Sequence, residues 1–149
     1  MLERNLYFAY GANICPDAMS WRCPMAKPLG AFELKDWQLE FYSHATIEPK
    51  PGASVHGVLW NLTDSCEKSL DSFEGFPTYY TKRTWYQDGY WFFFYEMSEY
   101  KQGSPSQGYI HGIANGYHQW QLPQPNIQEA LDRTYQNELH HRDIRYISK

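Results

Sequence analysis

The residue with the clearest potential for chemistry is Glu74, which lies where an amphipathic run ends. Leu70 and Phe73 share one side of this run. Gly75 and Pro77 then end it, since glycine favours the left-handed backbone beyond a helix and proline cannot continue one. Glu74 is therefore expected on the last helical turn, where the negative end of the helix dipole opposes a carboxylate. The aromatic residues close to it in sequence are Phe73, Phe76, Tyr79, Tyr80 and Trp85.

A carboxylate placed against both a helix dipole and an aromatic wall is expected to have a raised pKa, which suits a general base that works near neutral pH. The alternative from this stretch alone is an exposed glutamate at a helix end, because glutamate is seldom buried.

A second candidate site is the turn after a short apolar strand expected over residues 6–10. Gly11, Ala12 and Asn13 end this strand, and Pro16 is typical of the first turn of a short helix. A strand, a glycine turn and a helix start leave several backbone N–H groups in one concave loop, which suits a carboxylate or a developing oxyanion. The alternative is an ordinary strand-to-helix turn.

The rest of the chain must position these two stretches, and its strand-like patterns mostly precede its later helical ones. The expected strands cover residues 31–41, 45–47, 55–62, 79–87 and 90–97, with an irregular segment over 23–30 and turns at 49–52 and 88–89. Helices are expected up to Glu74 from a capping box of Asp64 and Glu67, and from Ser104 until Leu122-Pro123. A last helix begins at Asn126, and its expected buried side is Ile127, Leu131, Tyr135 and Leu139. This order predicts an α+β fold with a mixed or antiparallel sheet, in a single domain over residues 1–149.

Two glycine patterns indicate close packing. Gly57 lies inside a strand pattern, which predicts a bulge or a close approach of another backbone. Gly108, Gly112 and Gly116 form a stripe of small residues on the helix expected after Ser104, which predicts close packing on a sheet or a ligand.

Composition excludes several classes of function. The formal net charge is −4 and Lys and Arg form no block, which argues against a nucleic-acid partner. No apolar run is long enough to span a membrane, and the six histidines have no plausible metal spacing. Cys15, Cys23 and Cys66 match no zinc spacing and are interpreted as reduced thiols of a cytoplasmic protein. The aromatic content of 18% is interpreted as a core and a pocket wall.

Several spaced blocks together resemble the γ-glutamylcyclotransferase (AIG2-like) family. The run from Tyr7 to Asn13 looks like its opening strand and Tyr-Gly-Ser-Asn loop, and Leu70 to Gly75 is similar to the block that holds the family's catalytic glutamate. The other blocks follow in family order over roughly residues 6–123: Ala45-Thr46-Ile47, Val55 to Trp60, Tyr95-Glu96-Met97, Pro105 to Tyr109 and Leu122-Pro123. The resemblance implies the family's fold, a barrel-like mixed or antiparallel sheet with flanking helices.

The resemblance also implies site roles by position. Glu74 would be the catalytic acid and base. The substrate would be bound by the loop of Tyr10, Gly11, Ala12, Asn13 and Ile14 and by a pocket lined by Tyr95 and Tyr109. Two departures are that Ala12 replaces the family's usual serine, and that the segment between Phe41 and Ala45 lacks the longer loop of some family branches.

The implied reaction is cyclisation of a small-molecule γ-glutamyl substrate to 5-oxoproline with release of an amine, and it requires no cofactor and no metal. Two alternatives remain from the sequence. One is a protein that binds an anionic small molecule in the same pocket without turning it over, since a fold does not fix a function. The other is a partner-binding module that uses exposed aromatic side chains.

Overall fold

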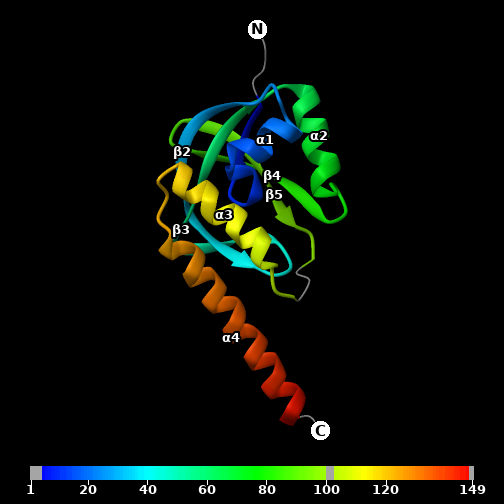
Figure 1. Cartoon of the computed structure of the whole chain (residues 1–149), viewed down its shortest axis with the longest axis vertical. Coiled ribbons are helices and arrows are strands. Elements are labelled where there is room, and N and C mark those ends of the chain that lie inside the picture. Colours follow the sequence, from blue (N-terminus) through cyan, green and yellow to red (C-terminus); the bar gives the residue numbers. More distant parts are fainter. Residues whose placement is uncertain (1–4, 100–102, 148–149) are drawn as a thin grey trace.

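The computed structural model describes residues 5–99 and 103–147, with side chains up to residue 136. These residues form a five-stranded sheet of order β2-β3-β1-β5-β4. The strands are β1 (Asn5–Ala9), β2 (Lys27–Phe41), β3 (Ala45–Leu62), β4 (Tyr80–Gln87) and β5 (Tyr90–Met97). Neighbouring strands are antiparallel except β1 and β5, which are parallel. The mixed sheet and its helices confirm the predicted α+β class (Figure 1).

The sheet is curved like a barrel, because its two edge strands, β2 and β4, lie close enough to contact each other. The side chain of Gln87 on β4 donates to the carbonyl of Glu33 and accepts from the N–H of Lys35 on β2, both at 2.9 Å. Further along the same strands, the rings of Trp37 and Trp85 meet edge to face with centroids 5.3 Å apart. The enclosed core is rich in aromatic side chains, as the composition predicted.

The helices cover the ends and one side of the sheet. They are the 3₁₀ turn η1 (Ala12–Ile14), α1 (Pro16–Arg22), α2 (Asp64–Glu74), α3 (Gln107–Gln119) and α4 (Pro125–Ile147). Figure 1 shows α1 beside α2 near the N-terminal end, and α4 leaving the body of the molecule. The first turns of α4 are anchored on β2, where the Thr134 hydroxyl donates to the Phe41 carbonyl at 2.7 Å. Within the described ranges, every helix is too short or too polar to cross a bilayer.

The strand boundaries differ from the prediction in the long β2–β3 hairpin. Residues 27–30 belong to β2, and the expected turn at 49–52 lies inside β3. Pro49 is tolerated there because β1 pairs with β3 only from Val58 to Leu62, so β3 has a free edge at this point. Asp36 has a positive φ, and its carboxylate accepts the N–H of Gly52 at 3.0 Å. A bulge therefore replaces the turn, and the two short strands form one.

The helix starts and faces also differ in detail. Thr63 rather than Asp64 caps α2, since its hydroxyl accepts the N–H of Cys66 at 3.1 Å. Similarly Ser106 caps α3, two residues after the expected start. The buried side of α4 consists of Ile127, Ala130 and Thr134. Tyr135 is exposed, Leu131 is only partly buried, and the side chain of Leu139 lies outside the described residues.

The prediction for Gly57 is confirmed, and that for Gly116 was right about close packing but wrong about the surface that it packs on. A Cβ at Gly57 would lie 2.1 Å from the Ala9 carbonyl oxygen, which confirms a close backbone approach. A Cβ at Gly116 would lie 2.8 Å from the side chain of Ile14, so α3 packs closely on η1 rather than on the sheet. Gly108 and Gly112 face open space, and the stripe as a whole is therefore not a packing surface.

Candidate active site

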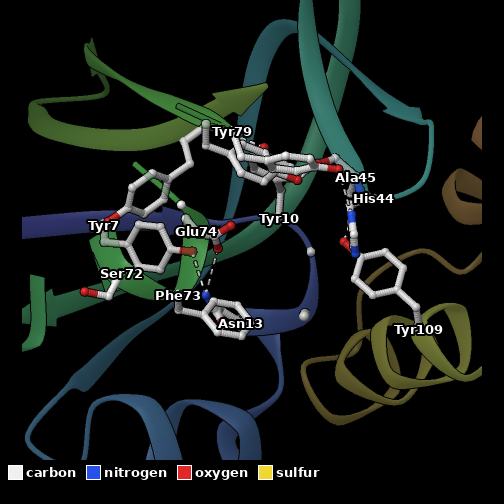
Figure 2. Close-up of a pocket in the computed structure, with 15 residues that line it drawn as sticks. Tyr7, Tyr10, Asn13, His44, Ala45, Ser72, Phe73, Glu74, Tyr79 and Tyr109 are labelled. Atoms are coloured by element: carbon white, nitrogen blue, oxygen red, sulfur yellow. Dashed lines mark hydrogen bonds between the residues drawn. The ribbon is translucent and has the colours of Figure 1, made fainter. Parts of the chain in front are cut away.

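The end of α2 places Glu74 at the wall of a cavity of about 370 Å³. Leu70, fully buried, fixes the helix to the core, and Gly75 ends it in the left-handed conformation at φ 66°, as predicted. Figure 2 shows the Glu74 carboxylate directed toward Asn13 and the tyrosine rings. Burial raises the pKa of Glu74 to about 7, and the positive charge of Arg22 opposes this rise. The raised pKa was predicted, and desolvation is its main cause.

The side chain of Asn13 joins the loop after β1 to Glu74. Its amide nitrogen donates to the Tyr7 hydroxyl at 3.1 Å and to the Glu74 carboxylate at 3.4 Å (Figure 2). Its amide oxygen accepts from Arg22 at 2.7 Å. The Asn13 backbone carbonyl accepts from the indole N–H of Trp60 at 3.1 Å, which ties the loop to β3. Asn13 is therefore held on three sides and is almost fully buried.

The same loop brings backbone donors to the cavity. Gly11, Ala12 and Asn13 line it. In η1 the N–H of Ile14 donates to the Gly11 carbonyl, and the N–H of Cys15 donates to the Ala12 carbonyl. The N–H groups of the first residues of such a turn have no partner within the turn, which leaves those of Gly11, Ala12 and Asn13 as donors for a ligand. The position of the loop at the cavity is compatible with an anion site, which stays a prediction.

Ile14 differs from the other loop residues singled out in the sequence. It is fully buried, packs against Gly116, and is not among the residues that line the cavity. Its N–H is bonded to Gly11, and its carbonyl accepts from the indole of Trp120 at 2.9 Å. Ile14 therefore supports the loop from behind, where a helix–turn contact fixes its position.

The remaining predicted residues, Tyr10, Tyr95 and Tyr109, all line the cavity, but their hydroxyls contact the protein. The Tyr10 hydroxyl donates to the Tyr95 carbonyl at 2.5 Å, and the Tyr95 hydroxyl donates to Asp71 at 2.6 Å. The Tyr109 hydroxyl accepts the N–H of Ala45 at 3.0 Å. Burial raises the pKa of Tyr109 to about 12 and also raises the pKa of Tyr10 and that of Tyr95, so these side chains stay neutral at physiological pH.

Further residues complete the cavity. Phe73, Tyr79 and Tyr80 belong to the aromatic wall that the sequence predicted beside Glu74, whereas Phe76 and Trp85 do not line the cavity. Sequence reasoning assigned no site role to Tyr7, His44, Ala45, Ser72 and Gly75. His44 precedes β3 and lies across the cavity from Asn13 (Figure 2), and its Nδ1 is 2.9 Å from the Tyr79 hydroxyl. The strand pattern of residues 6–10 placed Tyr7 on a strand, which was a signal that could have been used. No local pattern indicated His44.

Few of the side chains that line the cavity carry a formal charge. Of the described residues that line it, Glu74 is the one carboxylate, and none is a lysine or an arginine. Across the described ranges, His, Cys, Asp and Glu side chains form no group of three that could hold a metal ion. The arrangement therefore offers a carboxyl group whose pKa lies near neutral pH, backbone N–H donors beside it, and neutral aromatic walls. This set of groups suits proton transfer to and from a small polar molecule.

Comparisons with known proteins agree with this arrangement. The family model described as "Gamma-glutamyl cyclotransferase, AIG2-like" matches residues 7–120. The curated gamma-glutamylcyclotransferases of Homo sapiens and Mus musculus are each 35% identical to the chain over 85 residues, which cover 49% of this chain and 45% of theirs. The chain thus spans about half the length of the curated relatives that it matches.

Similarity to solved structures extends over more of the chain. A structure named gamma-glutamyl cyclotransferase has a TM-score of 0.75 and 29% identity, with 86% of each chain covered. A crystal structure of a Homo sapiens protein described as uncharacterized has a TM-score of 0.76 at the same identity, with 87% of each chain covered. The predicted family and its fold are confirmed.

Proposed function

The chain belongs to the Gamma-glutamyl cyclotransferase, AIG2-like family, and from this premise we propose that it cyclises a γ-glutamyl compound to 5-oxoproline with release of an amine. The observation that carries the proposal is the Glu74 carboxyl group, whose pKa is raised to about 7 at the wall of a cavity with no other carboxylate among its described lining residues. A group with this pKa accepts and returns a proton at neutral pH.

The reaction is intramolecular, so the protein has to fold the substrate and move protons. The α-amine of the γ-glutamyl unit is protonated in solution and must lose a proton before it can attack. Glu74 accepts that proton, and the amine then forms a bond to the γ-carbonyl carbon and closes a five-membered ring. Because the nucleophile is tethered to its target, holding the folded conformation lowers the barrier by several kcal/mol.

The tetrahedral intermediate carries an oxyanion, and its collapse breaks the original amide bond. The N–H groups of Gly11, Ala12 and Asn13 are the donors available to an oxyanion or to the substrate carboxylate. The departing nitrogen needs a proton, which the protonated Glu74 supplies. The α-nitrogen loses two protons in all, because the ring nitrogen formed by attack must still give up one. Glu74 passes the first proton to the departing nitrogen as the C–N bond breaks, then accepts the second from the ring nitrogen and transfers it to the released amine, which leaves as an ammonium ion. Glu74 thereby returns to its starting state.

The tyrosine-rich wall contributes by excluding water and charge. Six tyrosines line the cavity, and the pKa of each is raised by burial. They therefore remain neutral and provide ring faces that enclose the aliphatic chain of the glutamyl unit. Exclusion of water also strengthens hydrogen bonds from the loop to a charged oxygen.

The test is to incubate the purified protein with γ-glutamyl amino acids, γ-glutamyl amines and glutathione, and to quantify 5-oxoproline. We expect production from at least one class, and its loss in Glu74→Gln. The matched control is Glu33→Gln, because Glu33 is exposed on β2 and does not line the cavity. Retention of a panel compound by the folded protein without any 5-oxoproline would instead favour a binding protein.

A further inference from the structure

Arg22 does not line the cavity but contacts the groups on either side of Glu74. It is the last residue of α1, and its guanidinium donates to the Asn13 amide oxygen at 2.7 Å. Its guanidinium carbon also lies 3.7 Å from the ring centroid of Phe73, the residue before Glu74 on α2. One side chain therefore joins α1, the loop after β1 and the last turn of α2.

The contact with Arg22 decides which way the Asn13 amide faces. A guanidinium has only donors, so the atom of Asn13 that meets it must be the amide oxygen. The amide nitrogen then faces the Tyr7 hydroxyl and the Glu74 carboxylate, at 3.1 and 3.4 Å. A reversed amide would turn an oxygen toward the carboxylate and leave two acceptors in contact.

We propose that Arg22 is a positioning residue, which fixes the Asn13 amide so that its N–H donors hold the Glu74 carboxylate in place for proton transfer with the substrate. The inference rests on the proposed function for its kinetic readouts, while its structural readout needs no substrate. This role is not that of a substrate-binding residue, because Arg22 acts on Glu74 through the Asn13 amide and through its own positive charge.

The charge of Arg22 acts on Glu74 in a known direction. A nearby cation favours the carboxylate form, so Arg22 lowers the Glu74 pKa against the larger effect of burial. The other titratable groups that face Glu74 or share its cavity are Tyr7, Tyr10, His44, Tyr79, Tyr80, Tyr95 and Tyr109. Burial raises the pKa of each tyrosine, so these side chains stay neutral at physiological pH. The remaining group is His44, and the measurements are therefore repeated in a His44→Gln background.

The first experiment follows the side-chain carboxyl ¹³C signal of Glu74 with pH in ¹³C-glutamate-labelled protein, assigned by its absence in Glu74→Gln. In Arg22→Gln we expect the titration midpoint to move upward from that of the wild type. In Arg22→Lys the charge is kept but the planar fork is lost, so the midpoint moves less. The matched control is Arg83→Gln, which removes a guanidinium paired with Glu96 outside the cavity. We expect its midpoint to equal that of the wild type.

The second experiment is kinetic and uses whichever γ-glutamyl compound the wild type converts. Arg22→Gln and Arg22→Lys should each lower kcat about tenfold or more with little change in KM, because a small displacement of a catalytic group has large effects on rate. A double-mutant cycle with Asn13→Ala separates the effect that Arg22 has through Asn13 from the effect of its charge alone. If Arg22 acts through Asn13, Arg22→Gln has much less effect on kcat once Asn13 is alanine.

Two results would overturn the inference: a Glu74 midpoint in Arg22→Gln that matches Arg83→Gln, or fully additive losses of kcat in the cycle. Thermal unfolding of each variant shows whether the fold is kept, and Arg22→Lys preserves a cation over Phe73 if Arg22→Gln does not fold. Absence of 5-oxoproline from the wild type would contradict the proposed function alone, because the titration still tests the effect of Arg22 on Glu74.

Discussion

Asp71 and Glu74 lie one turn apart on α2, yet their carboxylates have very different surroundings. Asp71 belongs to what we call the Lys82 cluster, formed by Lys82, Glu67, Asp71 and the Tyr95 hydroxyl. Asp71 accepts from Lys82 at 2.8 Å and from Tyr95 at 2.6 Å. Among the described residues, the hydrogen bond to the Glu74 carboxylate comes from the Asn13 amide at 3.4 Å, and the pKa of Glu74 is raised to about 7.

The difference lets one helix turn combine a stabilising contact with the proton transfer that we propose for Glu74. The oxygens of Asp71 are occupied by protein donors, so this carboxylate links α2 to β4 and β5. Glu74 has few protein partners and lies at a cavity wall, so its oxygens remain available to a substrate proton. A carboxylate that exchanges protons has to be less well satisfied than one that holds the fold together.

The strongest test of this comparison is Glu74→Gln, which should lower kcat by roughly 10²- to 10⁴-fold, the usual contribution of a general acid–base group. The amide keeps the size of the side chain, so substrate binding and unfolding temperature should change little. Steady-state kinetics, isothermal titration with substrate and thermal unfolding measure the three quantities. A variant that lost binding as severely as turnover would show that Glu74 mainly holds the ligand.

The pH dependence of stability tests the burial of Glu74 directly. Its folded pKa of about 7 is above the ordinary value, so between about pH 4.5 and 7 the folded protein keeps a proton that the unfolded chain has released. The resulting stabilisation is fully present below the unfolded pKa and is lost as pH rises through the folded pKa. The wild type should therefore lose on the order of 3 kcal/mol relative to Glu74→Gln across this window.

Urea unfolding of both proteins at several pH values between 4 and 8 measures this difference. Turnover should move in the opposite direction, because kcat/KM requires the unprotonated Glu74 and rises through about pH 7. A difference in stability that does not vary with pH would mean that the Glu74 carboxyl group is as well solvated in the folded protein as in the unfolded chain.

Asp71→Asn should show the reverse pattern of Glu74→Gln. It weakens the contact with Lys82, whose ammonium then keeps only Glu67 as a charged partner in the cluster. Because these side chains are partly exposed, we expect a loss of about 1–2 kcal/mol in the free energy of unfolding. Substrate turnover below the unfolding transition should stay near that of the wild type. A large loss of kcat in a fully folded Asp71→Asn would show that the two carboxylates are not functionally separate.

The sequence was sufficient to predict the position of Glu74 at the end of a helix because the signals are local. Gly75 and Pro77 end the helix at a defined residue, and the resemblance of the surrounding block indicated a role for the carboxylate. The raised pKa was also expected, although the dipole argument understated burial, its main cause. Phe73, Tyr79 and Tyr80 gave a local signal of this burial, whereas Tyr7, Tyr10, Tyr95 and Tyr109 come from distant parts of the chain and gave none.

The residues that were missed are those placed by distant contacts. Arg22 reaches Asn13 only because α1 folds back over the loop after β1. His44 reaches Tyr79 only because the loop that connects β2 to β3 is short. The turn signal of residues 49–52 was wrong for a similar reason. Pairing with β2 is interrupted at 50–53 but continues on both sides, at Pro49 and at Ser54, which a local pattern does not reveal.

Tyr95 contacts both the cavity beside Glu74 and the Lys82 cluster, and removal of its hydroxyl should have the smallest effect among these tests. Its ring lines the cavity while its hydroxyl donates to Asp71. Tyr95→Phe should therefore cost about 1 kcal/mol of stability and leave KM within about twofold of the wild type, since only the Lys82 cluster loses a hydrogen bond. The matched variant is Tyr109→Phe, because the Tyr109 hydroxyl lies close to Gly11 in the loop and its loss should raise KM. If Tyr95→Phe raised KM more than Tyr109→Phe without loss of stability, the Tyr95 hydroxyl would have to turn from Asp71 to the substrate on binding.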